Sequence, residues 1–210
     1  MKYLRIFALA VVSIFMLSCT KNDETTVVLL GEESYIHDIV DVIPGNLQPT
    51  FAEHFTIHEG YIPPKVEGRY VVGKKERVYS NVDSLSWPLN VTEPNIYLTI
   101  KDQHNRVASL ILEEATSSET DTVYITGHDE YFTMYYVEYK SINYLGFDTR
   151  IKRAMLINGE VCEWGVKNLY IASVILEAYD NSGGALAQYK RGDFFIYKDG
   201  DGLSEFTNKE

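Results

Sequence analysis

The chain has 210 residues, 45% of them hydrophobic, and carries 19 basic and 30 acidic side chains for a formal net charge of −11. This length and composition predict one folded domain and exclude a disordered or collagen-like chain. The acidic balance disfavours nucleic acid as a partner, because an acidic surface repels phosphates. Two cysteines exclude a disulfide-rich scaffold.

The N-terminal residues predict a secretion signal. Lys2 and Arg5 precede the apolar run Ile6–Leu17, which is shorter than the roughly 20 residues that cross a bilayer as a helix. Met16-Leu17-Ser18-Cys19, at the end of this run, resembles the lipobox of bacterial lipoproteins. The resemblance implies a signal peptide over residues 1–18, cleavage before Cys19 and a lipid on its thiol. An ordinary secretory signal and a retained anchor helix are the alternatives.

The polar segment that follows predicts a flexible tether over residues 19–31. Within it, Lys21 followed by Asp23 and Glu24 resembles the surface-export signal of Bacteroidota lipoproteins. This resemblance implies an anchor in the outer membrane with the domain on the cell surface, and a periplasm-facing anchor is the alternative. Loss of residues 1–18 removes two of the 19 basic side chains and no acidic one, which leaves 17 against 30 and a formal charge of −13.

A helical lead-in is predicted over residues 32–62. Apolar residues recur at helical spacing over residues 33–47, as in a helix with one buried face. A second short helix over Pro49–Phe55 would place its two phenylalanines one turn apart. We expect this lead-in to pack against the domain that follows.

Residues 63–206 predict a β domain, because short runs rich in β-branched and aromatic residues alternate with turn residues. These runs are residues 69–72, 96–100, 107–112, 122–126, 131–139, 150–157, 170–179 and 194–197. Asn158-Gly159 favours a hairpin turn after the run 150–157. We expect Trp164, beyond that hairpin, to lie in the core, and Cys162 to be a small buried apolar residue.

The number and spacing of the runs predict a mainly β fold, either a single antiparallel β-barrel or a β-sandwich. Glu67-Gly68-Arg69-Tyr70 resembles the Gly-x-Trp entry of lipocalin-like barrels, with Tyr in the place of Trp. The longer segment Ile62–Tyr70 resembles the start of Bacteroidota lipoproteins in which a small helical segment precedes a Pro-Pro-x-Ile/Val-Glu-Gly-x-Tyr/Phe strand. These resemblances favour the barrel over the sandwich and imply no catalytic residues.

Candidate catalytic and metal-binding residues have simpler interpretations. His54 and His58 are four residues apart but lack the intervening Glu of HExxH, so we expect no metal there. Asp199-Gly200-Asp201-Gly202 lacks the remaining ligands of a calcium loop and predicts a turn. Acidic pairs such as Glu113-Glu114 are expected at strand ends, because no catalytic motif accompanies them. We therefore expect a protein that is not an enzyme and has no cofactor.

Tyrosine dominates the aromatic residues, with 16 Tyr against nine Phe and two Trp. Its apolar ring and polar hydroxyl suit both half-buried strands and binding surfaces. The ligand-binding candidates are Trp87, in a predicted loop, and four tyrosines of one predicted strand: Tyr131, Tyr135, Tyr136 and Tyr139. Strand alternation predicts that Tyr136 faces one way and the other three face the opposite way, with both faces covered.

These observations predict a lipid-anchored, non-catalytic binding domain for a glycan, a small apolar ligand or a protein partner. A structural or assembly component of an outer-membrane complex is the alternative, and a hydrolase of surface polymers is a third hypothesis. A tyrosine-lined pocket would favour binding, and a filled barrel with one exposed apolar patch would favour assembly. Two carboxylates facing each other across a cleft would favour hydrolysis.

Overall fold

The described part of the chain belongs to one unit. The computed structural model describes residues 43–82, 92–93, 95–114, 117–144, 147–180 and 189–207, all within the unit Glu32–Glu210. The predicted signal peptide, Cys19, the tether, most of the first predicted helix and Trp87 lie outside these residues. No helix in the described ranges is long and apolar enough to cross a membrane.

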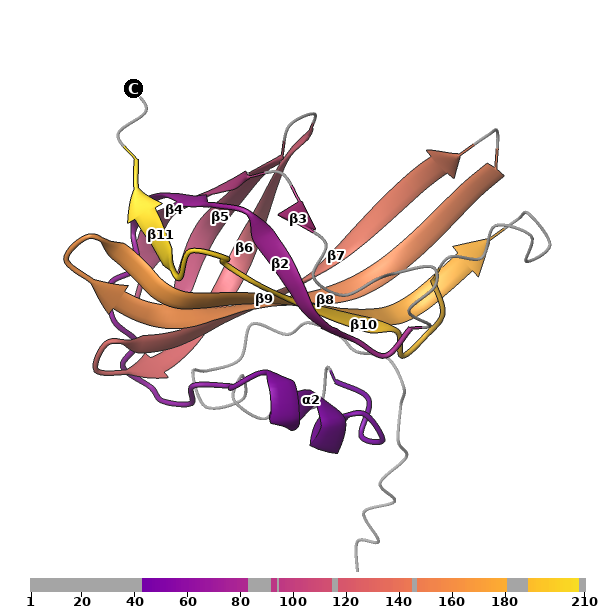
Figure 1. The fold of residues 1–210 in the computed structure, drawn as a ribbon, viewed down its shortest axis with the longest axis horizontal. Coiled ribbons are helices and arrows are strands. Elements are labelled where there is room, and N and C mark those ends of the chain that lie inside the picture. Colours follow the sequence, from indigo (N-terminus) through magenta and orange to yellow (C-terminus); the bar gives the residue numbers. More distant parts are fainter. Residues whose placement is uncertain are drawn as a thin grey trace, which may run out of the picture. The chain divides into compact units, whose positions relative to one another are not determined.

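These residues form one short helix and an 11-stranded sheet (Figure 1). The elements are α2 (Gln48–His54), β1 (Gly68–Val72), β2 (Lys75–Ser80), β3 (Thr92–Glu93), β4 (Ile96–His104), β5 (Val107–Glu114), β6 (Ser117–His128), β7 (Tyr131–Tyr144), β8 (Phe147–Cys162), β9 (Gly165–Asp180), β10 (Phe194–Lys198) and β11 (Leu203–Phe206). Every predicted run lies within one of these strands, whereas β2, β3 and β11 were not predicted.

The sheet closes into an eight-strand antiparallel barrel, which confirms the predicted barrel and excludes the sandwich. Neighbouring strands pair in the order β11-β1-β4-β5-β6-β7-β8-β9, and β11 also pairs with β9. We call this β11–β9 contact the closing seam. The first residues of β9 form the seam, with Lys167 opposite Leu203. Its later residues pair with β10, from which β2 and β3 extend the sheet.

Alternation along the strands fills much of the barrel with apolar side chains. On β4, for example, Ile96, Leu98 and Ile100 all belong to the interior cluster. Tyr70 and Phe132 are among its largest fully buried members. The Tyr70 hydroxyl donates a hydrogen bond of 2.9 Å to the carbonyl oxygen of Val66, so its polar atom is satisfied inside the barrel.

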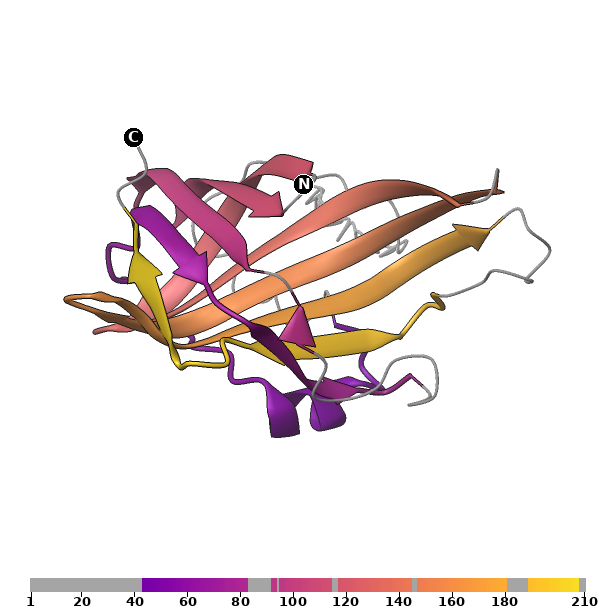
Figure 2. The same ribbon diagram turned by 45° about the horizontal axis from the view of Figure 1, so that its top comes forward.

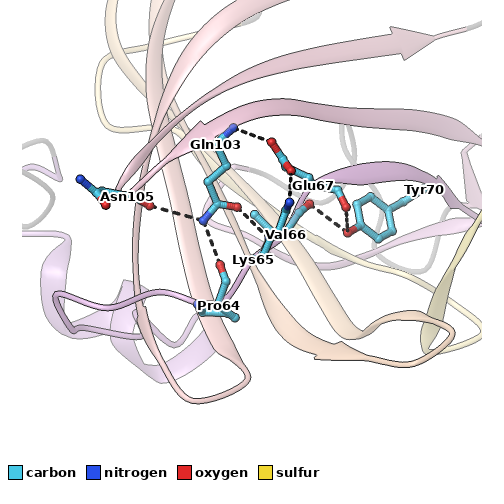
Figure 3. Close-up of polar contacts among 7 residues, drawn as sticks. All are labelled: Pro64, Lys65, Val66, Glu67, Tyr70, Gln103 and Asn105. Atoms are coloured by element: carbon cyan, nitrogen blue, oxygen red, sulfur yellow. Dashed lines mark hydrogen bonds and ion pairs between the residues drawn. The ribbon is translucent and has the colours of Figure 1, made fainter.

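The segment that enters β1 is held against the end of β4 by polar contacts (Figure 3). The Gln103 side chain donates to the Pro64 carbonyl oxygen at 2.9 Å and accepts from the Val66 N–H at 2.8 Å. The Gln103 N–H donates to Glu67 Oε1 at 2.8 Å. Because these bonds fix the segment, Val66 is buried in the interior cluster. Pro64, Val66 and Glu67 of the sequence motif therefore have a structural role.

A second apolar cluster covers part of the outer face of the barrel, and α2 packs there. Phe51 and Phe55 lie one helical turn apart, as predicted, with ring centroids separated by 5.1 Å. Phe51 also lies 5.8 Å from the Phe194 ring of β10. Tyr135 of β7 joins this outer cluster, whereas Phe132 belongs to the interior one. Both faces of β7 are thus covered here, as alternation predicted.

The predicted hairpin turn at Asn158-Gly159 is wrong, because both residues lie inside β8. The ladder between β8 and β9 is irregular at this point. Asn158 is buried, and its side-chain amide donates to the Thr56 carbonyl oxygen at 2.6 Å. A Cβ on Gly159 would overlap the Val166 side chain. The glycine therefore lets β9 approach closely instead of making a turn.

The turn from β8 to β9 is Glu163-Trp164. Trp164, at the tip of this turn, is 67% exposed, so the expectation that it lies in the core is wrong. That expectation depended on the misplaced hairpin. Cys162 ends β8 and is only partly buried, less than predicted.

The predicted turn at Asp199–Gly202 is confirmed and separates β10 from β11. Asp199 is 3% exposed, and its carboxylate accepts a 2.6 Å hydrogen bond from the Ser204 hydroxyl. Burial raises the pKa of Asp199 to about 6, although the hydrogen bond from Ser204 opposes this shift; the neighbouring Asp201 carboxylate adds to it. The folded protein therefore holds a proton here more tightly than the unfolded chain does.

We expect Asp199→Asn to stabilise the protein at pH 7. Because the folded pKa exceeds the usual 3.8, this group lowers stability as the pH rises from about 4 to above 6. The shift from 3.8 to about 6 corresponds to roughly 3 kcal/mol at most, so we expect a gain on the order of 1–3 kcal/mol at pH 7. Urea unfolding at several pH values should show a flatter profile for the variant over that interval. An unchanged profile would show that Asp199 is ionised in the folded state across this range.

Candidate functional site

The barrel wall opens between β6 and β7. The ladder between these strands runs from His128↔Tyr131 to Tyr124↔Tyr135. Beyond that point β6 continues along β5, and β7 continues along β8. The two strands therefore diverge, with β7, β8 and β9 projecting together away from β4, β5 and β6 (Figures 1 and 2). We call this divergence the split.

Charged side chains from both sides meet at the split. Glu138 of β7 pairs with Arg153 of β8, and Lys140 of β7 reaches across to Glu119 of β6 with an N–O distance of 3.0 Å. Glu138 is 7% exposed. These side chains link β6 to β7 where the described backbone ladder no longer does.

The carboxylates at the split affect one another. Burial raises the pKa of Glu138 above its ordinary value, although Arg153 opposes the shift. Burial also acts on Glu119, but its contacts with Lys140 and Glu138 outweigh that effect and lower its pKa. Burial and the nearby Glu119 charge raise the pKa of Asp121. Glu138 and Asp121 therefore lose their protons at a higher pH than isolated carboxyl groups do, and Glu119 loses its proton at a lower pH.

This carboxylate arrangement differs from the one expected for a glycosidase. Glu119 and Glu138 are in hydrogen-bond contact with each other. Glycosidases place their two carboxyl groups roughly 5–9.5 Å apart so that substrate and water fit between them. The contact between Glu119 and Glu138 leaves no such space.

A cavity of about 130 Å³ is lined by residues of β2, β4, β5, β8, β9 and β10, and we call the part of the barrel that contains it the open end. Its lining combines apolar residues, charged residues and aromatic rings. The lining residues are Lys75, Ile96, Leu112, Glu114, Arg153, Met155, Ile171, Ser173, Ile175, Tyr189, Phe195 and Tyr197. A water molecule occupies about 30 Å³ in the liquid, and pockets that enclose drug-sized ligands measure roughly 300–1,000 Å³. The cavity is thus suited to a small molecule or to one end of a larger one.

Lys75 and Tyr197 form one wall of the cavity, and Arg77, which is not among the lining residues, contacts Tyr197. Arg77 is 3% exposed and donates to the Tyr197 hydroxyl at 3.1 Å. Its guanidinium carbon lies 5.2 Å from the centre of the Tyr197 ring. The Lys75 ammonium lies 5.6 Å from the same ring and 3.8 Å from Glu114. This wall can offer hydrogen bonds and positive charge to a ligand beside the apolar floor.

The structure separates the tyrosines that the sequence suggested as ligand-binding residues. Tyr135 packs in the outer cluster, 5.5 Å from the Tyr124 ring. Tyr136 is buried inside the barrel, and burial raises the pKa of its hydroxyl. Tyr131 stacks on His58 with a centroid distance of 5.1 Å. Tyr139 is 77% exposed. Strand alternation and position along β7 explain why these four do not form one surface.

The two histidines of the lead-in also have separate surroundings. His54 stacks on Tyr79 with a centroid distance of 3.9 Å, whereas His58 stacks on Tyr131. Burial lowers the pKa of His58, and the nearby His128 adds to this effect. No group of three or more His, Cys, Asp and Glu residues in the described ranges is placed to hold a metal ion.

Comparison with protein-family models, with curated proteins and with solved structures found no match. Sequence reasoning missed Lys75 and Arg153 as residues that line the cavity. One signal was present, because Glu138 falls on the same face of its strand as Phe132. A charge on an otherwise apolar face predicts a buried partner.

Proposed function

We propose that the barrel binds a small polar ligand, or one polar end of a larger ligand, at its open end and does not catalyse a reaction on it. The observation that carries this proposal is the cavity of about 130 Å³ with an apolar floor and a charged wall. Lys75, Glu114 and Arg153 in the lining favour a ligand with hydroxyl or carboxylate groups over a wholly apolar one. Among the ligand classes considered from the sequence, a sugar or sugar acid fits this chemistry best.

We further propose that the protein acts at the outer membrane through a lipid on Cys19, with the barrel facing the cell surface. The support is the N-terminal sequence, in which Met16-Leu17-Ser18-Cys19 ends a short apolar run. A short tether would then separate the anchor from the barrel. A ligand site at the envelope suits a protein whose acidic surface disfavours nucleic acid.

The binding proposal predicts that a sugar or sugar acid will raise the melting temperature. Glucose, galactose, glucuronate and galacturonate are suitable probes in a thermal-shift series. A ligand present at 100 times its Kd stabilises the folded state by about 2.7 kcal/mol, which raises the melting temperature by roughly 5 °C or more. The substitution Ser173→Trp, which fills the cavity, should abolish the shift.

Ser109→Trp on β5 is the matched control, because Ser109 is only partly buried and does not line the cavity. It should keep the shift seen in the unmodified protein. If none of the four probes changes the melting temperature, or if Ser173→Trp retains the full shift, binding in this cavity is contradicted.

The anchor proposal predicts that Cys19 carries fatty acid. Cells grown with labelled palmitate should give a labelled protein that fractionates with the outer membrane. Cys19→Ala should lose the label, because the thiol that accepts the lipid is absent. Equal labelling of both forms would contradict the anchor. Protease treatment of intact cells would separate a surface-facing barrel from a periplasm-facing one.

A further inference from the structure

We propose a second binding site on the outside of the barrel, where two exposed tyrosines flank a pair of cations and together dock an acidic polysaccharide. The residues of this site, which we call the outer patch, come from the projecting ends of β7, β8 and β9. They are Tyr139, Ser141, Arg150, Lys152, Glu177 and Tyr179. The outer patch goes beyond the proposed function, because it lies on the opposite face of the sheet from the cavity.

The register of the strands places the outer patch on one face. Tyr139 is opposite Lys152, and Lys152 is opposite Glu177. In the neighbouring row, Arg150 is opposite Tyr179. Glu138 and Arg153, next to these positions, point into the barrel instead, as alternation requires.

Both tyrosine rings are available to a ligand. Tyr139 is 77% exposed and Tyr179 is 62% exposed. Because β8 lies between their strands and the two tyrosines are offset by two residues, their backbone positions are roughly 10 Å apart across the sheet and about 7 Å apart along it. A shallow cavity of about 220 Å³ lies over these strands. Such spacing suits an extended polymer that places one ring against each tyrosine.

The charge of the outer patch is opposite to that of the chain. Lys152 lies 3.3 Å from Glu177 and 5.5 Å from the centre of the Tyr139 ring, so its ammonium is held between the two strands. Arg150 is exposed and makes no ion pair with any residue that the structure describes. The cavity lining contains three cations and one carboxylate, which are Lys140, Arg150, Lys152 and Glu177. The whole chain, in contrast, has a formal net charge of −11. An anionic partner is therefore attracted here and repelled by much of the remaining surface.

The pattern of side chains favours an acidic polysaccharide over an acidic protein. Protein interfaces are enriched in Tyr and Arg but depleted in Lys and Glu, whereas here the Lys152–Glu177 pair lies beside Tyr139 in the outer patch. Sugar rings offer an apolar face for stacking and a rim of hydroxyls, and uronic acids add a carboxylate for the guanidinium. The exposed tyrosine rings can stack on the apolar faces of such a polymer, and the cations between them can bind its carboxylates.

Affinity measurements with polygalacturonate test the outer patch. Titration calorimetry of the unmodified protein should show saturable binding. The double substitution Tyr139→Ala/Tyr179→Ala should weaken binding by about tenfold or more, since each stacked ring is worth roughly 1 kcal/mol. Arg150→Ala should also weaken binding and reduce its dependence on salt. Neutral dextran and poly-glutamate are the comparison polymers and should bind at least tenfold more weakly.

Matched controls come from the same chain. Tyr61→Ala removes an equally exposed tyrosine, at 61%, near the Gly127 end of β6. Lys101→Ala removes an exposed cation of β4. Neither should change the affinity. Ser173→Trp should leave polygalacturonate binding intact even if it abolishes sugar binding in the cavity, so failure of one site is distinguishable from failure of the other.

Three results would overturn the proposal. The first is the absence of polygalacturonate binding by the unmodified protein. The second is binding of poly-glutamate as tight as that of polygalacturonate, which would identify an acidic polypeptide or general charge attraction as the basis. The third is equal affinity for the unmodified protein and the Tyr139→Ala/Tyr179→Ala variant, which would exclude stacking on the outer patch.

Discussion

Replacing Gly165 with alanine is expected to destabilise the protein by about 3–5 kcal/mol, because backbone strain and lost seam hydrogen bonds add together. Gly165 has a φ of +149°, which side-chain-bearing residues rarely adopt. A Cβ there would overlap the carbonyl oxygen of Ser204. Since Gly165 pairs with Glu205 in the closing seam, the overlap would push β11 away from β9. Urea unfolding followed by circular dichroism measures the loss.

Alanine substitutions at two other glycines distinguish backbone strain from overlap at the closing seam as the cause of that loss. Gly202 has a φ of +78° but has no atom within 4 Å of the position of a Cβ, so Gly202→Ala should cost only about 1 kcal/mol from backbone strain. Gly45 has neither a positive φ nor a close neighbour, and Gly45→Ala should change stability by less than about 0.5 kcal/mol. Equal losses for Gly165→Ala and Gly202→Ala would show that overlap at the seam is unimportant.

Loss of the Arg153 guanidinium at the split has the second large expected effect. Arg153→Gln leaves the buried Glu138 carboxylate without its ion-pair partner. Breaking such a pair costs about 3–5 kcal/mol when it is fully buried, and the partial exposure of Arg153 reduces the expected loss at pH 7 to about 2–4 kcal/mol. The measurement is the free energy of unfolding in urea at pH 7 and at pH 4.

The loss should be smaller at pH 4. Burial already raises the pKa of Glu138 above 4.5, and removal of the arginine charge raises it further. A raised carboxyl pKa gives stability that is present at low pH and is lost as the pH rises through the folded value. The variant therefore approaches the unmodified protein when Glu138 is protonated.

Adding Glu138→Gln to Arg153→Gln removes the buried charge and should recover most of the stability lost at pH 7. Arg150→Gln, on the same strand but exposed and unpaired among the described residues, should change stability by less than about 0.5 kcal/mol. A double variant no more stable than Arg153→Gln would mean that packing of the arginine stem, and not its charge, stabilises the split.

Most of the fold could be predicted from local patterns. Alternating apolar residues located the long strands, and the one-turn spacing of Phe51 and Phe55 located the helix over Gln48–His54. Asn158-Gly159 misled because its turn preference is local, whereas β7 and β9 pair with both sides of β8 through that point. Long ladders on two edges outweigh the preference of one dipeptide.

The open end could not be predicted, because it depends on which strands part. Nothing in the sequence near Tyr124 or Tyr135 indicates that their ladder ends there. Lys75 and Arg153 lie on strands far apart in the sequence and meet at the cavity only after the sheet has formed. Tyr139 was predicted as a ligand-binding residue from composition, but its neighbours in the outer patch depend on the register of three strands. The ligand-binding assignment of Tyr131, Tyr135, Tyr136 and Tyr139 stays a prediction.

The split has a consequence for motion. The ring consists of one group, β1-β4-β5-β6, and a second group, β7-β8-β9, which are joined by the short β6–β7 ladder on one side and by β11 on the other. Backbone amides in the long ladders inside each group exchange with solvent only after extensive opening, whereas opening at the short joints costs less free energy. The two groups can therefore move relative to each other about two short joints, and the Lys140–Glu119 ion pair links the groups at one of these joints.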